Sequence, residues 1–309
     1  MSIQVIYITG FGRSGSTILD IVLGSAPNVF GCGELNAFVR SGLLRGEPCS
    51  CGKPVPDCSV WSEVVKAWPL ARDKSALRAY SSIVDKADRS PLIRSRVSAR
   101  AWDFFRRHSA DLYQAISEVV GAVVLIESSK SPHRLRNLLG LQGVDFQAIH
   151  LIRDVVGVVS SMHRGLAADP SAGVAKDIPS RSSFQTVAAW RASNHSAERV
   201  CRDMGDRSIV VHMEQMISSP VSTFEQVARH YGLDLTRVCA AVAANQPIPI
   251  HHPVAGNRLR MQENLVIRQD AASCESGARS DWLRRIAVFG ASRRLRQTLM
   301  GGTTSRDGC

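Results

Sequence analysis

A glycine-rich turn between a strand and a helix constrains this chain more than any other feature. Residues 10–17 read Gly-Phe-Gly-Arg-Ser-Gly-Ser-Thr. The apolar, β-branched run 3–8 precedes the turn, and residues 18–23 follow it with helical spacing. Backbone N–H groups at such a strand-to-helix turn attract phosphate, so the pattern predicts a phosphate cradle. The plainer interpretation is a tight β–α connection with no ligand.

The cradle departs from the loop that binds ATP or GTP. In that loop a lysine follows the second glycine and reaches the β- and γ-phosphates. Here Gly10 and Gly15 have the required separation, but Ser16 occupies the lysine position and the basic residue is Arg13, inside the loop. The pattern retains donors for a phosphate and lacks the means of holding a magnesium-bound triphosphate.

A second motif follows another buried strand. The apolar run 146–152 leads into Arg153 and Asp154, and Ser161 lies two helical turns further on. Arg153 and Ser161 are thus placed to reach one anion at the edge of the sheet. The alternative is a surface pair of Arg153 with Asp154, beside a serine on a solvated helix face.

In this order and separation, the two motifs resemble those of sulfotransferases that use 3′-phosphoadenosine 5′-phosphosulfate (PAPS). The pattern is most similar to bacterial sulfotransferases related to the tyrosylprotein branch, with Arg-Ser-Gly-Ser-Thr at 13–17 and Gly-Glu at 33–34. Matches extend over about residues 3–36 and 122–260. The resemblance implies a P-loop NTPase-like, three-layer α/β fold, with a parallel sheet and helices on both faces. It also implies transfer of a sulfuryl group from PAPS to a hydroxyl or amine, with 3′-phosphoadenosine 5′-phosphate (PAP) as product and no metal required.

The resemblance assigns roles to individual residues. The 5′-phosphosulfate would be held by Arg13, Ser14, Gly15, Ser16 and Thr17. The 3′-phosphate would be held by Arg153 and Ser161, and Arg258 belongs to a late loop, 251–260, that would close over the nucleotide. Glu34 would be the catalytic base, and Arg13 and Lys130 would stabilise developing charge. Without the resemblance, Glu34 is a solvated carboxylate in the glycine-rich turn 30–36, and Lys130 is a solvated neighbour of a helix start at Ser131-Pro132.

One position departs from the family pattern, because Met213 stands where a strand usually ends in Tyr-Glu. This change keeps open a catalytically inactive, nucleotide-binding relative. A P-loop nucleotide-dependent kinase is the rival among enzymes, and the missing lysine disfavours it. The acceptor is expected to be a small molecule, glycan, lipid or peptide, and no motif chooses among these classes or indicates an oligomeric state.

Length and spacing suit one α/β domain over residues 1–309. Strands are expected near 3–9, 122–127, 146–152 and 208–212, alternating with helices, and 44% of the residues are hydrophobic. The segment 36–120 is interpreted as an insertion that helps to form the acceptor pocket. Residues 279–299 are expected to form a basic amphipathic helix, whose apolar face packs on the domain unless its basic face touches an acidic membrane.

Charge and hydropathy limit the remaining classes. A net charge of +11 suits an enzyme that binds an anionic nucleotide. Nucleic acid is disfavoured as a partner because arginines are scattered and aromatic residues make up 6% of the chain. No apolar run is long enough for a membrane span and the first strand starts at residue 3, so a cytoplasmic protein without a signal peptide is expected.

Three cysteines form a cluster in the segment 49–58. Cys49, Cys51 and Cys58 could bind zinc with a fourth ligand from elsewhere, such as Cys32 or a histidine. Alternatively, two of them could pair as a disulfide, or all could stay free. Their spacing is not that of a standard zinc site, so no metal is assigned from the sequence.

Overall fold

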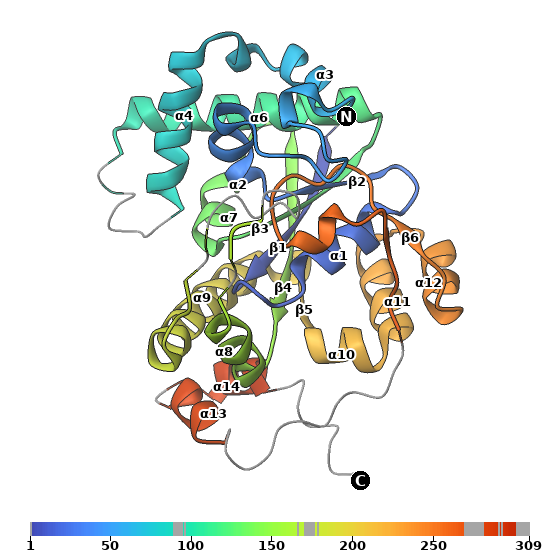
Figure 1. The fold of residues 1–309 in the computed structure, drawn as a ribbon. Helices are drawn as coiled ribbons and strands as arrows, with labels where there is room; N and C mark the ends of the chain where they lie inside the picture. Colours follow the sequence, from blue (N-terminus) through green and yellow to red (C-terminus); the bar gives the residue numbers. More distant parts are fainter. Residues whose placement is uncertain are drawn as a thin grey trace.

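A five-stranded parallel sheet forms the centre of the molecule (Figure 1). The computed structural model describes residues 2–88, 95, 97–165, 167–169, 177, 179–268, 281–289, 291 and 293–300. The strand order is β2-β3-β1-β4-β5. The strands are β1 Ile3–Gly10, β2 Val29–Gly33, β3 Val124–Lys130, β4 Val144–Ile152 and β5 Ser208–His212.

Alternating side chains of β1 enter two different cores, as a sheet buried on both faces requires. Ile3, Val5 and Tyr7 pack with α3, α4, α6, α7 and the end of α9, whereas Ile6 and Ile8 pack with α1, α10, α11 and α12. The expected three-layer fold with helices on both faces is confirmed. The helices are α1 Ser16–Gly24, α2 Leu35–Ala37, α3 Trp61–Ala67, α4 Lys74–Ala87, α6 Ala99–Val120, α7 Pro132–Leu138, α8 Val155–His163, α9 Ser183–Met204, α10 Met213–Ser218, α11 Pro220–Tyr231, α12 Thr236–Ala243, α13 Asp281–Val288 and α14 Arg293–Met300. Short elements complete the fold: the strands β6 Ile248–Pro249 and β7 Asn264–Leu265, a π-helix Phe38–Leu43, and 3-10 helices Val55–Asp57, Pro69–Arg72, Gly205–Arg207 and Arg258–Met261.

Residues 30–33 of the glycine-rich segment 30–36 belong to an edge strand and residues 35–36 to α2, which corrects the turn expected there. Residues 29–33 pair with β3 as the edge strand β2. A Cβ at Gly31 would lie 2.6 Å from Asp20 Oδ1, so the missing side chain lets α1 pack closely on β2. The glycine at position 31 therefore allows α1 and β2 to pack closely. The next strand also differs from expectation, because β3 extends to Lys130 instead of ending at 127.

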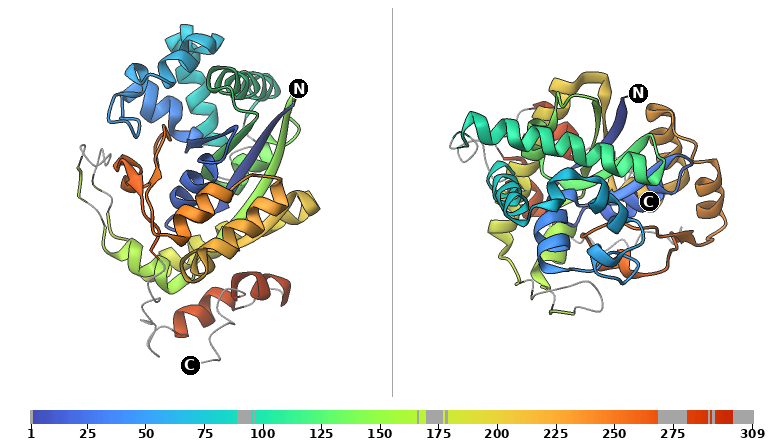
Figure 2. Two further views of the ribbon diagram at one scale, coloured as in Figure 1. Left: turned by 90° about the vertical axis from the view of Figure 1, so that its right-hand side faces the viewer. Right: turned by 90° about the horizontal axis from the view of Figure 1, so that it is seen from above.

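The segment between β2 and β3 stacks its helices at one end of the molecule, opposite α13 and α14 (Figure 2). A chain of aromatic contacts joins this segment together: Trp61, Phe38, Trp68, Tyr80 and Phe105 contact one another in that order. All five rings are almost fully buried. This part of the chain is thus built around its own aromatic core, continuous with one face of the sheet.

The basic helix expected over 279–299 is two helices, α13 and α14. Between them, residues 289 and 291 are not helical, and residues 290 and 292 lie outside the described residues. Residues 279 and 280 lie outside the described residues. Buried Leu283, Ala287 and Leu295 pack against α8 and α9, and Arg284 Nε donates to Asp154 Oδ2 at 2.8 Å. Among the described residues, no helix combines the length and apolar character needed to cross a membrane.

Candidate active site

A cavity of about 660 Å³ lies beyond the carboxyl ends of the parallel strands, where α/β sheets usually bind ligands. Nine residues singled out from the sequence line it together: Arg13, Gly15, Ser16, Thr17, Glu34, Lys130, Arg153, Ser161 and Arg258. They come from four strand ends and the late loop, so segments more than 200 residues apart in sequence meet at one site. Ser14 is the predicted loop residue that does not line the cavity.

The loop after β1 forms one wall of the cavity. Helix α1 starts at Ser16, so the first N–H groups of that helix belong to the loop. Ser14 is buried beneath it, 2% exposed, and its Oγ has no hydrogen-bond partner among the described residues. Arg13 has a left-handed backbone with φ 68°, a conformation that is uncommon outside glycine and concentrates at functional sites.

Arg153 connects the second motif to this loop. It follows β4, and its Nη1 donates to the backbone oxygen of Arg13 at 2.9 Å. Trp190 Nε1 donates to the Arg153 carbonyl oxygen at 3.0 Å, which holds the backbone in place. Burial lowers the pKa of Arg153 relative to its ordinary value, although arginine remains charged at neutral pH. Ser161, on α8, lines the cavity and is partly buried.

Glu34 and Lys130 form an ion pair at the ends of two adjacent strands. Lys130 Nζ donates to Glu34 Oε1 and also to the Ser128 carbonyl oxygen, at 3.3 Å. Their side chains are 20% and 21% exposed, so both can meet a ligand in the cavity. Like Arg13, Lys130 has a left-handed backbone, with φ 67°. In place of the expected turn, Glu34 lies between the end of β2 and the start of α2, and its N–H donates to the Val254 carbonyl oxygen at 2.8 Å.

A buried carboxyl group lies behind this pair. Asp20 is 1% exposed on α1, and its Oδ2 accepts the Gly33 N–H at 3.1 Å. Burial raises the pKa of Asp20 to about 7, while hydrogen bonds from Ser128 and Gly33 and the charge of Lys130 act in the opposite direction. Sequence reasoning missed Asp20; its signal was an acidic residue inside the apolar run 18–23.

The late loop forms another part of the cavity wall through residues 256–259. The Asn257 N–H donates to Thr17 Oγ1 at 3.2 Å, and Val254 pairs with Gly33 through backbone hydrogen bonds on either side. Arg181 and Met162 also line the cavity, and the Arg181 N–H donates to the Met162 carbonyl oxygen at 3.2 Å. No sequence pattern pointed to Arg181, because the stretch around it carries no motif.

The cavity is strongly cationic. Five arginine and lysine residues line it, namely Arg13, Lys130, Arg153, Arg181 and Arg258. Among the described lining residues, Glu34 is the single carboxylate. Met213 lines the cavity as well, where it presents a thioether in place of a hydroxyl. Such a lining suits a ligand with several negative charges.

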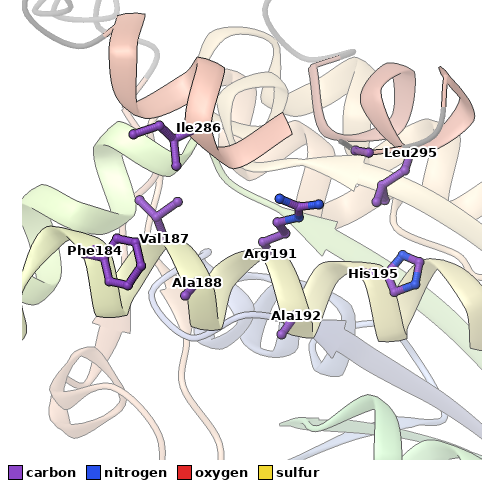
Figure 3. A pocket seen from close by; sticks show the side chains of 9 residues that line it. Phe184, Val187, Ala188, Arg191, Ala192, His195, Ile286 and Leu295 are labelled. Atoms are coloured by element: carbon purple, nitrogen blue, oxygen red, sulfur yellow. The ribbon is translucent and has the colours of Figure 1, made fainter. Parts of the chain in front are cut away.

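A second cavity, of about 550 Å³, has a different character (Figure 3). It lies between α9 and the helices α13 and α14, and is lined mainly by apolar side chains such as Val187, Ile286 and Leu295. None of the residues singled out from the sequence lines it. Convergent polar groups from several strand ends therefore place the candidate site in the cationic cavity.

Comparison with known proteins identifies the family. A model described as "Sulfotransferase family" matches residues 5–237. The chain belongs to this sulfotransferase family. No curated protein matches the chain.

Solved structures similar to this sulfotransferase include three bacterial examples. The sulfotransferase domain from the Synechococcus PCC 7002 olefin synthase is 20% identical, with 98% of this chain and 95% of that chain covered and a TM-score of 0.49. Sulfotransferase STF9 from Mycobacterium avium is 14% identical, with coverages of 78% and 67% and a TM-score of 0.47. The sulfotransferase domain from the curacin biosynthetic pathway is also 14% identical, with both coverages 74% and a TM-score of 0.43.

Proposed function

We propose that this sulfotransferase uses PAPS as its donor and transfers the sulfuryl group to a hydroxyl or amine of an acceptor. The hydrogen bond from Arg153 Nη1 to the Arg13 carbonyl oxygen carries the proposal. It joins the phosphate loop after β1 to the cationic group after β4 within one cavity. PAPS bears anionic groups at its 5′ and 3′ positions, and a site with two linked cationic ends suits such a nucleotide.

The lining residues divide between these two ends. Arg13 and the 15–17 loop would hold the 5′-phosphosulfate, through the N–H groups at the start of α1 and the hydroxyls of Ser16 and Thr17. Ser14 would support the loop from below, where its buried hydroxyl has no hydrogen-bond partner among the described residues. Arg153 and Ser161 would hold the 3′-phosphate, and Arg258 would cover the nucleotide from the late loop.

Glu34 and Lys130 are positioned for the chemical step. Bound PAPS supplies an activated sulfuryl group, whose transfer builds up negative charge on oxygen. Arg13 and Lys130 would offset that charge, and Glu34 would accept the proton that the acceptor loses. Because Lys130 holds Glu34 Oε1 in the structure, the two side chains would act as a pair.

A thermal-shift titration with PAP, beside ATP with magnesium, tests the donor class. Bound at 100 times its dissociation constant, PAP should stabilise the protein by about 2.7 kcal/mol. Arg153→Ala should weaken PAP binding by about 10- to 100-fold, since it removes a charge-assisted contact worth about 1.5–3 kcal/mol, with little change in the melting temperature of the free protein. Arg136→Ala is the matched control, because Arg136 is exposed and paired with Asp203 away from the cavity.

Stabilisation by ATP with magnesium but not by PAP would contradict the donor assignment and favour a kinase. Turnover is tested separately, by incubating the protein and radiolabelled PAPS with mixtures of small-molecule, glycan, lipid and peptide acceptors. PAP binding without any labelled product across these classes would favour the inactive relative.

A further inference from the structure

Four residues with metal-binding side chains meet outside the cationic cavity. Cys49, Cys51 and Cys58 come from the segment after the π-helix, and His252 comes from the late loop. Their ligand atoms all lie within 4.8 Å of one another. His252 is 194 residues from Cys58 in sequence, so the fold supplies the fourth group that the cysteine spacing alone did not identify.

Two distances in this cluster, from His252 to Cys49 and to Cys58, are close to those around a tetrahedral ion. Zinc–sulfur bonds of about 2.3 Å and zinc–nitrogen bonds of about 2.0–2.1 Å put neighbouring sulfur and nitrogen ligands about 3.6 Å apart. His252 Nδ1 lies 3.2 Å from Cys58 Sγ and 3.7 Å from Cys49 Sγ. A disulfide would use two of the three sulfurs. It would not explain why the third sulfur and the His252 imidazole lie in the same cluster.

The surroundings of the cluster hold its ligands in place. Trp61 Nε1 donates to the His252 carbonyl oxygen at 2.6 Å, and the Cys49 N–H donates to the Lys53 carbonyl oxygen at 2.9 Å. Arg260 is buried, 2% exposed, and its Nη1 donates to the carbonyl oxygen of Pro48, the residue before Cys49, at 3.0 Å. Three thiolates, one neutral histidine and Zn²⁺ carry a net charge of −1, which the Arg260 guanidinium would balance. Outer groups that orient ligands and offset charge are typical of metal sites.

We propose that Cys49, Cys51, Cys58 and His252 bind one structural zinc ion. Four protein ligands complete a tetrahedral site and leave no position for a substrate, so the ion has a structural role. Soft thiolates with one imidazole select zinc over magnesium or calcium. The ion fastens the late loop to the 48–61 segment, alongside the backbone bridge between Cys49 and Val254.

This attachment positions the rim of the cationic cavity. Three residues after Val254, Asn257 binds Thr17 through its backbone N–H, and Arg258 lines the cavity. Zinc bound at one end of the loop therefore fixes the other end beside the phosphate loop. The inference about the metal does not depend on which donor or acceptor the sulfotransferase uses.

Metal analysis of the whole chain, purified under reducing conditions without a polyhistidine tag, tests the proposal. Mass spectrometry of metals should find about one zinc ion per chain. Cys58→Ser and His252→Ala should each lose most of the zinc and lower the melting temperature. Cys239→Ser is the matched control, because Cys239 is a buried free cysteine on α12 outside the cluster, and this variant should keep the metal.

A second measurement keeps the test valid if the cluster variants fail to fold. Wild-type protein stripped of metal with a chelator should take up one equivalent of Co²⁺ and show the intense visible absorption of a tetrahedral cobalt–thiolate site. Metal-free wild type that shows no cobalt–thiolate absorption would overturn the proposal. A disulfide among the three cysteines in protein purified separately without reductant, or unchanged zinc in a folded Cys58→Ser variant, would also overturn it.

Discussion

At the scale of single residues, an ion pair joins Glu34, the proposed catalytic base, to Lys130, which would stabilise developing charge. Each side chain is about one-fifth exposed, so solvent screens the pair in part, and an amide in place of the carboxylate could still accept a hydrogen bond from Lys130. For function, the position of the pair at the ends of two adjacent strands matters more than its effect on stability. Removing the carboxylate should therefore separate catalysis from both stability and nucleotide binding.

Glu34→Gln should lower turnover by about 10²- to 10⁴-fold, because the amide cannot accept the acceptor's proton. PAP affinity and melting temperature should stay close to the wild-type values. Sulfated product measured under saturating PAPS, together with PAP titration, checks both expectations. Glu63→Gln is the control, since Glu63 is an exposed carboxylate paired with Lys66 on α3. Turnover within tenfold of wild type would remove Glu34 from the catalytic role.

The buried carboxyl of Asp20 should make stability depend on pH. Burial raises its pKa in the folded protein to about 7, above the ordinary value of 3.8. The folded state therefore binds this proton more tightly than the unfolded state, and the contribution of Asp20 to stability falls as pH rises from about 4 to about 7. Above that range the full cost of burying the charge is present.

Asp20→Asn removes this titration and keeps an oxygen that can accept the Gly33 N–H. The free energy of unfolding of the variant, relative to wild type, should increase from pH 5 to pH 7 and then level off. Urea unfolding at each pH measures it. Asp73→Asn is the control: hydrogen bonds from Ser75 and Ala76 lower the pKa of this exposed carboxyl, so its ionisation is complete by pH 5. A difference for Asp20→Asn that does not vary with pH would contradict the expectation.

At the scale of secondary-structure elements, the edge strand β2 joins the sheet to the late loop. Val254 pairs in parallel with Gly33 and antiparallel with Cys49, so the loop lies between the sheet edge and the segment after the π-helix. A Cβ at Gly33, which has φ +78°, would lie 2.2 Å from the Val254 carbonyl oxygen. A side chain at this position has no room unless the late loop moves.

Gly33→Ala should therefore displace the late loop from β2. The left-handed backbone costs about 1–2 kcal/mol and the steric clash about 1–3 kcal/mol, so the unfolding free energy should fall by about 2–5 kcal/mol. PAP should also bind more weakly, because Asn257 and Arg258 move with the loop. Gly121→Ala isolates the backbone cost, since Gly121 has φ +65° and nothing within 4 Å of its added Cβ. If Gly33→Ala and Gly121→Ala lowered the unfolding free energy equally in urea, the expected clash with Val254 would be contradicted.

At the scale of the whole molecule, basic side chains gather at the candidate site. The chain carries a net charge of +11. Five arginine and lysine residues line the candidate site, and Glu34 is the one carboxylate among its described lining residues. This arrangement attracts anions, and salt weakens the attraction, because the screening length falls from about 10 Å at 0.1 M to about 3 Å at 1 M ionic strength. Nucleotide affinity should therefore fall as the salt concentration rises.

PAP affinity should fall several-fold when the salt concentration rises from about 0.05 to about 0.5 M. Arg258→Ala should reduce this salt dependence, because it removes one exposed charge from the cavity rim. Arg136→Ala, remote from the cavity, should leave the dependence unchanged. Calorimetric titration at several salt concentrations measures both, and a salt-independent PAP affinity would contradict an electrostatic binding site.

The order of local elements was predictable because each depends on neighbours in sequence. The apolar run before Gly10 forms β1, and the run 146–152 lies within β4, with Arg153 directly after it. The helix start at Ser131-Pro132 was also readable, and Ser131 Oγ accepts the Arg134 N–H at 3.2 Å as an N-cap. These patterns placed the glycine-rich loop directly after β1 and Arg153 directly after β4, and the α/β class and the family resemblance followed from them.

Other features depend on contacts that no local pattern records. Pairing with β3 makes residues 29–33 an edge strand where a turn was expected, and His252 lies beside Cys58 although 194 residues separate them. Arg181 enters the cavity from a stretch without a motif. The sequence by itself determined the fold class, the family and most of the cationic site, because strand ends and glycine turns are local. The tertiary structure decided the Glu34–Lys130 pair, the burial of Asp20 and the four-residue cysteine–histidine cluster, because each requires distant segments to pack against one another.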